Sequence, residues 1–155
     1  MLVYLVRHGE AVSETKDPAR PLSRQGDKQI NLLAEFAARH FRLMPGHILH
    51  SPKLRAAQTA AIISQTLLQA PAPEETDGLG PMDDPAIWAE RLEVMDLDTM
   101  LVGHLPHLPS LASLLLLSDS GRQILDFTPG TVACLEKAGA WRVKWMISPD
   151  TLKNP

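Results

Sequence analysis

The feature that most constrains the fold is an alternation of short apolar runs, rich in β-forming residues, with longer segments of helical spacing. The first run, residues 2–6, ends abruptly at the polar tripeptide Arg7-His8-Gly9. A short apolar run of this kind is typical of a strand that is buried on both faces. Strands that alternate with helices favour an α/β fold. We therefore predict a three-layer sandwich, with a mostly parallel central sheet covered by helices on both faces.

Capping residues and apolar spacing place the other elements. Ser23 is typical of a helix N-cap, and apolar residues recur after it at helical spacing as far as Phe41. Ser51-Pro52 predicts a second helix, with a capping serine and a proline at its first position, that reaches about Leu68. The other predictions are a loop over 70–86 around one short strand, helices over 86–95 and 108–117, and strands over 47–50, 99–102, 132–136 and 141–147.

Length and composition fit one compact domain over residues 1–155, because 45% of the residues are hydrophobic and can form a core without disulfides or metal. The net charge of −3 argues against a general nucleic-acid binder, which needs a broad basic surface. The single cysteine, Cys134, lies in an apolar run and is predicted to be a buried structural thiol.

We expect neither a signal peptide nor a membrane span in this chain. The segment before Arg7 is too short for a signal peptide and lacks a basic leader. The longest apolar patch, around residues 114–117, is shorter than the roughly 18 residues that a membrane span needs. We expect a cytoplasmic protein that does not associate with membranes.

Three polar clusters each follow a predicted strand. Arg7-His8-Gly9 follows the first strand, residues 51–55 follow the second, and Gly103-His104 follows a later one. Open α/β sheets bind their ligands at the carboxyl ends of the strands. We therefore expect two histidines and two arginines to converge there, although they are distant in the sequence.

This set of side chains suits a phosphoryl group. The planar guanidinium of an arginine, such as Arg7 or Arg55, binds two phosphate oxygens at once and does not lose its charge. A neutral imidazole can attack phosphorus, and a second imidazole can donate a hydrogen bond to a phosphate oxygen. Arg55 also falls in the first turn of its predicted helix, where free backbone amides favour an anion.

Each cluster alone has an ordinary structural interpretation. Arg7-His8-Gly9 can arise in a loop by chance, Arg55 can be a solvated helix residue, and His104 can be a hydrogen-bonded histidine at a strand end. The joint pattern, three clusters in order at equivalent strand ends, favours a functional site.

The chain resembles the histidine phosphatase superfamily, also called the phosphoglycerate mutase-like fold. Within it, the chain is most similar to the short phosphohistidine phosphatases of the SixA type. The matching segments are Leu5-Val6-Arg7-His8-Gly9-Glu10, Pro21-Leu22-Ser23 with Gly26, Ser51-Pro52-Lys53-Leu54-Arg55-Ala56-Ala57-Gln58-Thr59, Val102-Gly103-His104-Leu105-Pro106, and the ending Trp145-Met146-Ile147-Ser148-Pro149 with Leu152-Lys153.

The resemblance implies roles for matching residues. His8 would be the phosphorylated nucleophile, and Arg7, Arg55 and His104 would hold the phosphoryl oxygens. Residues of the pocket or its mouth would be Gly9, Arg20 and Ser51. The implied activity is hydrolysis of protein phosphohistidine without cofactor or metal, and the implied partner is a phosphohistidine-bearing protein such as a histidine-containing phosphotransfer domain.

One departure from the family pattern bears on the substrate. Many members carry an acidic residue as general acid between the second and third clusters, but here Asp77, Asp83 and Asp84 are best interpreted as solvated loop carboxylates. An alkoxide leaving group needs a proton, whereas imidazole has a pKa of about 6.5 and leaves readily with its own proton. The departure therefore favours P–N over P–O substrates.

Three other interpretations stay open at this point. One is a metal hydrolase that uses His47 with His50 or His104 with His107, although residues three apart on a strand point to opposite faces and the second pair has no acidic or thiol companion. The second is a phosphate-binding module without turnover. The third is a phosphatase of small monoesters, such as sugar or nucleotide phosphates, on the same fold.

Overall fold

The central sheet of the computed structural model, which describes residues 1–152, has six strands in the order β3-β2-β4-β1-β5-β6. Lys153, part of the ending used for the family resemblance, lies outside the described residues. The first four strands in this order run parallel, and the last two pair antiparallel. The strands are β1 (Leu2–Arg7), β2 (His47–His50), β3 (Glu74–Glu75), β4 (Thr99–Gly103), β5 (Val132–Ala138) and β6 (Ala140–Ile147).

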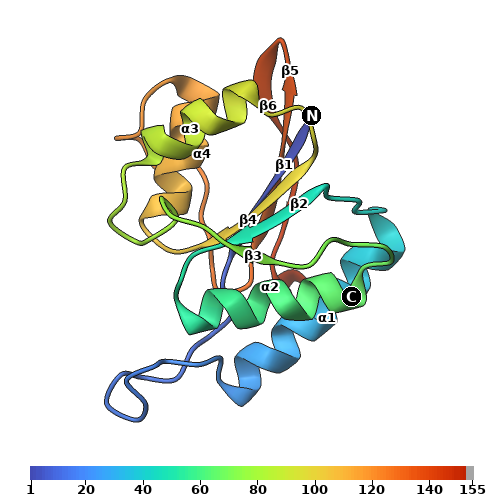
Figure 1. The fold of residues 1–155 in the computed structure, drawn as a ribbon, viewed down its shortest axis with the longest axis vertical. Coiled ribbons are helices and arrows are strands. Elements are labelled where there is room, and N and C mark those ends of the chain that lie inside the picture. The colour runs from blue at the N-terminus through green and yellow to red at the C-terminus, as the bar shows by residue number, and fades with distance from the viewer. Residues whose placement is uncertain (153–155) are drawn as a thin grey trace.

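Helices cover both faces of this sheet (Figure 1). Helices α1 and α2 pack together on one face, and α3 and α4 pack together on the other. The helices are α1 (Arg24–His40), α2 (Leu54–Thr66), α3 (Pro85–Val94) and α4 (His107–Leu117), and a final 3-10 turn is η1 (Pro149–Leu152). The predicted three-layer sandwich with a mostly parallel sheet is therefore confirmed.

Strand β1 shows how the sequence builds the two cores. Tyr4 and Val6 pack into the cluster beneath α1 and α2, whereas Val3 and Leu5 pack into the cluster beneath α3 and α4. All four side chains are buried, because successive residues of a strand point to opposite faces and both faces are covered. Cys134 on the neighbouring β5 is buried in the first cluster, as predicted for a structural thiol, and burial raises its pKa to about 12.

Parallel pairing brings the polar clusters to one edge of the sheet. Arg7 at the end of β1 is in register with Gly103 at the end of β4, and His50 at the end of β2 is in register with Val102. The three chain segments that leave these strands therefore start side by side, as the sequence pattern predicted.

The predicted start of the second helix is wrong. Helix α2 begins at Leu54, its N-cap is Lys53 without a side-chain capping bond, and it ends at Thr66. Ser51 does not cap it: the Ser51 hydroxyl accepts from the backbone N–H of Lys53, one residue before the helix begins, and its other contact is His104. The predicted cap at Ser23 is confirmed, since its side chain accepts a hydrogen bond from the backbone of Gly26.

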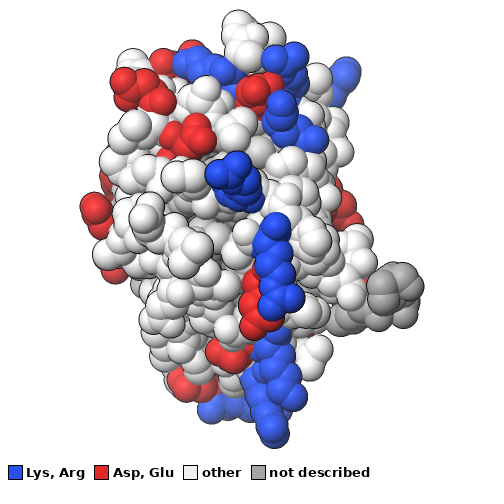
Figure 2. All heavy atoms as spheres, turned by 90° about the vertical axis from the view of Figure 1, so that its right-hand side faces the viewer, with Lys and Arg blue, Asp and Glu red and all other residues white. Residues whose placement is uncertain are grey.

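Charged side chains of both signs share the face shown in Figure 2. Lys and Arg side chains form a broken vertical line there, with Asp and Glu side chains interspersed. None of the helices within residues 1–152 has the length and apolar character that a membrane crossing requires. The cytoplasmic location expected from the sequence stays a prediction.

Candidate active site

His8 follows the last residue of β1, and the bonds to its two ring nitrogens differ. Nδ1 lies 2.7 Å from the carbonyl oxygen of Gly9, which can only accept, so Nδ1 carries the proton. Nε2 lies 3.2 Å from Arg55, whose Nε–H donates to it. Nε2 therefore holds the lone pair, and this lone pair points toward the arginine of the second cluster.

The surroundings of His8 keep its imidazole neutral. Burial is the main cause that lowers the pKa of His8 to about 4. The hydrogen bond to Gly9 opposes this shift, and the positive charges of Arg55, Arg7 and Arg20 reinforce it. A neutral imidazole with an unprotonated Nε2 is the form that can attack phosphorus.

Arg55 is the second residue of α2, so the chain places it in the first helical turn, as the sequence predicted. It is only 9% exposed, and burial lowers its pKa, as does the nearby charge of Arg20. The free backbone amides of a helix start attract an anion. A buried guanidinium at this position can therefore bind a phosphoryl oxygen together with those amides.

His104 lies beside His8, with the two ring centroids 4.9 Å apart. The Ser51 hydroxyl is 2.5 Å from His104 Nε2, which joins the second and third clusters directly. Burial is again the main cause that lowers the pKa of His104 to about 3, and His8 and Arg55 lower it further.

Arg7 is anchored at the end of β1. Its backbone N–H donates to Thr131, and its guanidinium donates to the carbonyl of Phe127. Its Nε is buried without a hydrogen-bond partner among the described residues. Burial lowers the pKa of Arg7, and the charge of Asp126 opposes that shift. This guanidinium is thus held in place with donor capacity left over.

Gly9 permits the close packing behind the nucleophile. A Cβ there would lie 2.8 Å from the Ile30 side chain of α1, closer than real Cβ contacts come, so a larger residue would require Ile30 or the loop to shift. The Gly9 N–H donates to the Thr59 hydroxyl, which itself donates to the carbonyl of Arg55. Thr59 is a residue whose contact the sequence interpretation missed; its position four residues after Arg55, on the same helix face, was the available signal.

Arg20 lies in the loop between β1 and α1 with a positive φ of 49°. Its Nε donates to the carbonyl of Val12, which ties the loop together. Its charge lowers the pKa of both His8 and Arg55, so it adds to the positive potential of the site.

The three loop carboxylates considered as proton donors each bond elsewhere. Asp77 pairs with Arg91 at 2.8 Å, Asp83 accepts from the backbone of Gly80, and Asp84 caps α3. These carboxylates are exposed, in agreement with the sequence interpretation. Among residues 1–152, no three side chains of His, Cys, Asp or Glu gather in an arrangement that could hold a metal ion.

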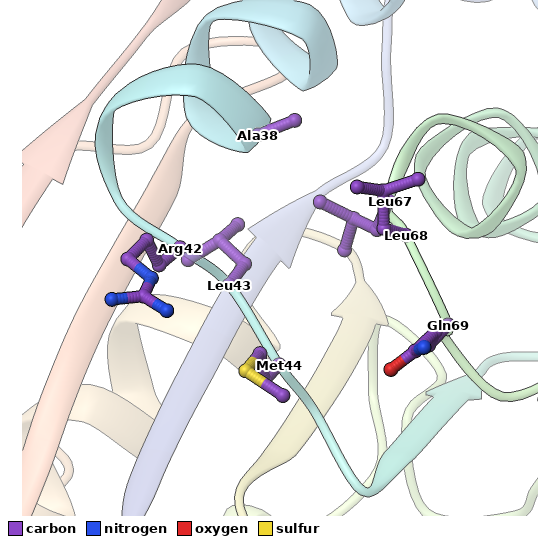
Figure 3. A pocket seen from close by; sticks show the side chains of 7 residues that line it. All are labelled: Ala38, Arg42, Leu43, Met44, Leu67, Leu68 and Gln69. Carbon is purple, nitrogen blue, oxygen red and sulfur yellow. The ribbon is translucent and has the colours of Figure 1, made fainter.

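A separate apolar groove of about 470 Å³ lies at the other ends of α1 and α2 (Figure 3). Arg42, Leu43 and Met44 line it from the connection after α1, facing residues 67–69 from the segment after α2. Neither His8 nor His104 lines this groove, so the candidate active site and the groove lie at different ends of the α1–α2 layer.

The geometry brings together two imidazoles, the buried guanidinium of Arg55 and the partly buried guanidinium of Arg7 at the carboxyl edge of the parallel strands, a set that suits a phosphoryl group. The sequence matches the histidine phosphatase superfamily (branch 1) over residues 3–83, more than half of the chain. The chain belongs to this superfamily and has the fold of its phosphatases.

Solved structures cover nearly the whole chain. The protein histidine phosphatase SixA complexed with tungstate is 27% identical with a TM-score of 0.85, and the match covers 99% of this chain and all of that one. A proposed phosphohistidine phosphatase SixA from Agrobacterium tumefaciens is 22% identical with a TM-score of 0.78, covering 96% of this chain and 97% of that one. A phosphoserine phosphatase variant from Entamoeba histolytica, bound to phosphoserine, is 15% identical with a TM-score of 0.72, covering 97% and 98%. No curated protein sequence matches the chain.

Proposed function

We propose that this phosphatase hydrolyses phosphohistidine on a partner protein, through a covalent phosphoryl group on His8 and without a metal ion. In the first step, His8 Nε2 forms a bond to phosphorus while the P–N bond of the substrate breaks. The substrate ring, which carries a proton on its other nitrogen, takes the electron pair of that bond and leaves as neutral imidazole. In the second step, a water oxygen attacks phosphorus, the bond to Nε2 breaks, and inorganic phosphate leaves.

The bonds around His8 support the first step. The Gly9 carbonyl fixes the Nδ1–H tautomer, so Nε2 carries no proton and holds the lone pair that attacks. Arg55 donates to that same Nε2 at 3.2 Å, so an incoming phosphoryl group meets a guanidinium beside the attacking atom. Arg7, Arg55 and His104 would neutralise the charge of the transferring group.

The observation that carries the choice of substrate is that the hydrogen bonds of both imidazoles go to a carbonyl, a hydroxyl and a guanidinium, and none goes to a carboxylate among residues 1–152. The charged groups that shift the pKa of His8 are Arg55, Arg7 and Arg20, and all of them are cations. His104 likewise responds to other histidines, Arg55 and Lys53. The carboxylates of Asp77, Asp83 and Asp84 bond to Arg91 or to backbone amides and not to either imidazole. An alcohol leaving group would need such an acid. An imidazole leaving group needs little help.

Exposure around the site fits a protein substrate. Pro52 and Lys53 are exposed, and Leu54, next to Arg55, is 41% exposed. A phosphohistidine on the surface of a helical domain could therefore reach Arg55 and His8. The 27% identity with the protein histidine phosphatase SixA, over the whole chain, agrees with this partner class.

A small phosphate monoester is the second candidate. The phosphoserine phosphatase of E. histolytica has the same fold, but at 15% identity that likeness concerns the fold alone. The two candidates differ in their need for an acid, so a comparison of leaving groups can decide between them.

The test is kcat/KM for a phosphorylated histidine-containing phosphotransfer domain against phosphoserine and sugar phosphates, in the presence and absence of a chelator. We expect the phosphohistidine protein to be preferred by at least about 10²-fold and the rate to be unchanged by chelation. A preferred sugar phosphate, or a rate lost in chelator, would refute the proposal. Asp83→Asn is the variant to measure beside the wild type, because it should lower the rate only if the Asp83 carboxyl group supplies a proton to the leaving group.

A further inference from the structure

Ser51 occupies a junction between the second and third polar clusters. Its backbone N–H donates to the carbonyl of Val102 at 3.1 Å, which fixes Ser51 against the end of β4. Its side chain is fully buried, and the hydroxyl lies 2.5 Å from Nε2 of His104. The hydroxyl thus has little freedom to turn to another partner.

The proton positions in this contact follow from the bonds around the hydroxyl. The backbone N–H of Lys53 donates to Ser51 Oγ at 3.3 Å and uses one of its lone pairs. The hydroxyl hydrogen then needs an acceptor, and among the described residues His104 Nε2 is the acceptor within reach. If Nε2 carried the proton instead, the hydroxyl hydrogen would be buried without an acceptor, at a cost of about 1–3 kcal/mol.

A donating hydroxyl determines which nitrogen of His104 carries the proton. Since Ser51 donates to Nε2, the neutral ring carries its proton on Nδ1. Nδ1 is buried and has no hydrogen-bond partner among residues 1–152. The ring stands next to His8, with centroids 4.9 Å apart, so a phosphoryl group on His8 would bring its oxygens close to His104.

We propose that Ser51 is a positioning residue, which holds His104 in the Nδ1–H tautomer so that this N–H donates to a phosphoryl oxygen. The inference rests on the proposed function, because it assumes a phosphoryl group on or near His8. The unpaired Nδ1–H then gains an acceptor only when a phosphoryl group is present. A hydrogen bond to the charge that develops on this group in the transition state accelerates the reaction.

The charge state of His104 agrees with this role. Burial and the positive groups around it lower the pKa of His104, so the ring is neutral at pH 7. A neutral imidazole has one N–H, whereas an imidazolium has two and could donate without help. The choice of tautomer therefore matters in this site, and Ser51 makes that choice.

The first test reads the tautomer directly in the free protein. Nitrogen-15 NMR of histidine-labelled protein distinguishes a protonated Nδ1 from a protonated Nε2. We expect the His104 signals of the wild type to show a protonated Nδ1, and Ser51→Ala to lose this preference. A protonated Nε2 in the wild type would overturn the proposal, whatever substrate the enzyme prefers.

The second test reads the consequence in turnover. Ser51→Ala should lower kcat roughly 10- to 100-fold with a smaller change in KM, because the lost hydrogen bond strengthens in the transition state. Ser51→Thr, which keeps a hydroxyl, should recover part of that loss. Ser113→Ala is the matched control, since it removes another fully buried serine hydroxyl from α4 and should leave kcat unchanged.

The two proposals can fail separately. Turnover is measured with a phosphohistidine protein and with p-nitrophenyl phosphate in parallel. If the wild type prefers the ester but Ser51→Ala still lowers kcat on it, the substrate assignment fails and the role of Ser51 holds. If Ser51→Ala retains wild-type kcat on both substrates, the role of Ser51 is refuted.

Discussion

The two ends of the α1–α2 layer present opposite kinds of surface. At the carboxyl edge of the sheet, His8 accepts from the Arg55 guanidinium and His104 bonds to the Ser51 hydroxyl, each through a defined ring nitrogen. At the far end, the groove between residues 42–44 and 67–69 is mostly apolar (Figure 3). A large hollow is a poor guide to chemistry in this molecule, because phosphoryl transfer depends on positioned charge rather than on enclosed volume.

Substitution of a histidine should give the largest difference in turnover between variants of the two ends. His8→Ala should abolish acid-labile phosphoryl labelling and reduce turnover by roughly 10⁴-fold or more, as expected for loss of a nucleophile. His40→Ala, at the exposed end of α1, is the matched control and should behave as wild type. Labelling that persists in His8→Ala would move the nucleophile to another residue.

Substitution of an arginine should give the next largest difference in turnover between the two ends. Arg55→Lys keeps a positive charge but loses the paired donors that can hold two oxygens. We expect turnover to fall about 10²–10³-fold in this variant, nearly as far as in Arg55→Ala. The same change at Arg42, in the apolar groove, should leave turnover unchanged. Full activity in Arg55→Lys would show that Arg55 does not bind the phosphoryl group and is an ordinary helix residue.

The pH dependence of labelling tests whether burial lowers the pKa of His8. The pKa of His8 is lowered to about 4, so the nucleophile stays unprotonated as the pH falls from 7 to 5. Single-turnover labelling should therefore be nearly constant over this range and decline as the pH passes about 4. With an unshifted pKa of about 6.5, the rate of labelling would already be roughly 30-fold below its maximum at pH 5, because only that fraction of the histidine would be neutral. A decline centred near 6.5 would contradict the burial argument.

The sequence predicted well how the polar clusters meet at the carboxyl edge of the sheet, because the signals there are local and strong. A buried apolar strand that stops at Arg7-His8-Gly9 indicates both the strand and its polar end, and parallel pairing makes strand ends converge. The convergence of His8, Arg55 and His104 could thus be inferred from order alone. Their roles in catalysis stay predictions.

Tertiary contacts account for what the sequence did not predict. Ser51-Pro52 has the local pattern of a helix start, yet α2 begins at Leu54. The capping interpretation failed because the Ser51 hydroxyl bonds to His104, which is distant in the chain, and local propensity cannot report such a partner. The bond between Gly9 and Thr59 was missed for the same reason.

The smallest effect should come from the groove, and it tests whether that end of the layer matters to the enzyme at all. Leu68 is 90% exposed, whereas Leu43 in the same groove is 6% exposed and belongs to the core cluster beneath α1 and α2. Leu68→Ser removes little buried surface and should change the free energy of unfolding by less than about 0.5 kcal/mol, with kcat/KM unchanged. Leu43→Ala should instead cost about 2–5 kcal/mol, because it leaves a cavity. Denaturant unfolding and steady-state turnover on the same samples check both values. If Leu68→Ser lowered kcat/KM on a phosphohistidine protein but not on p-nitrophenyl phosphate, the groove would take part in protein recognition, and the functional separation of the two ends would be wrong.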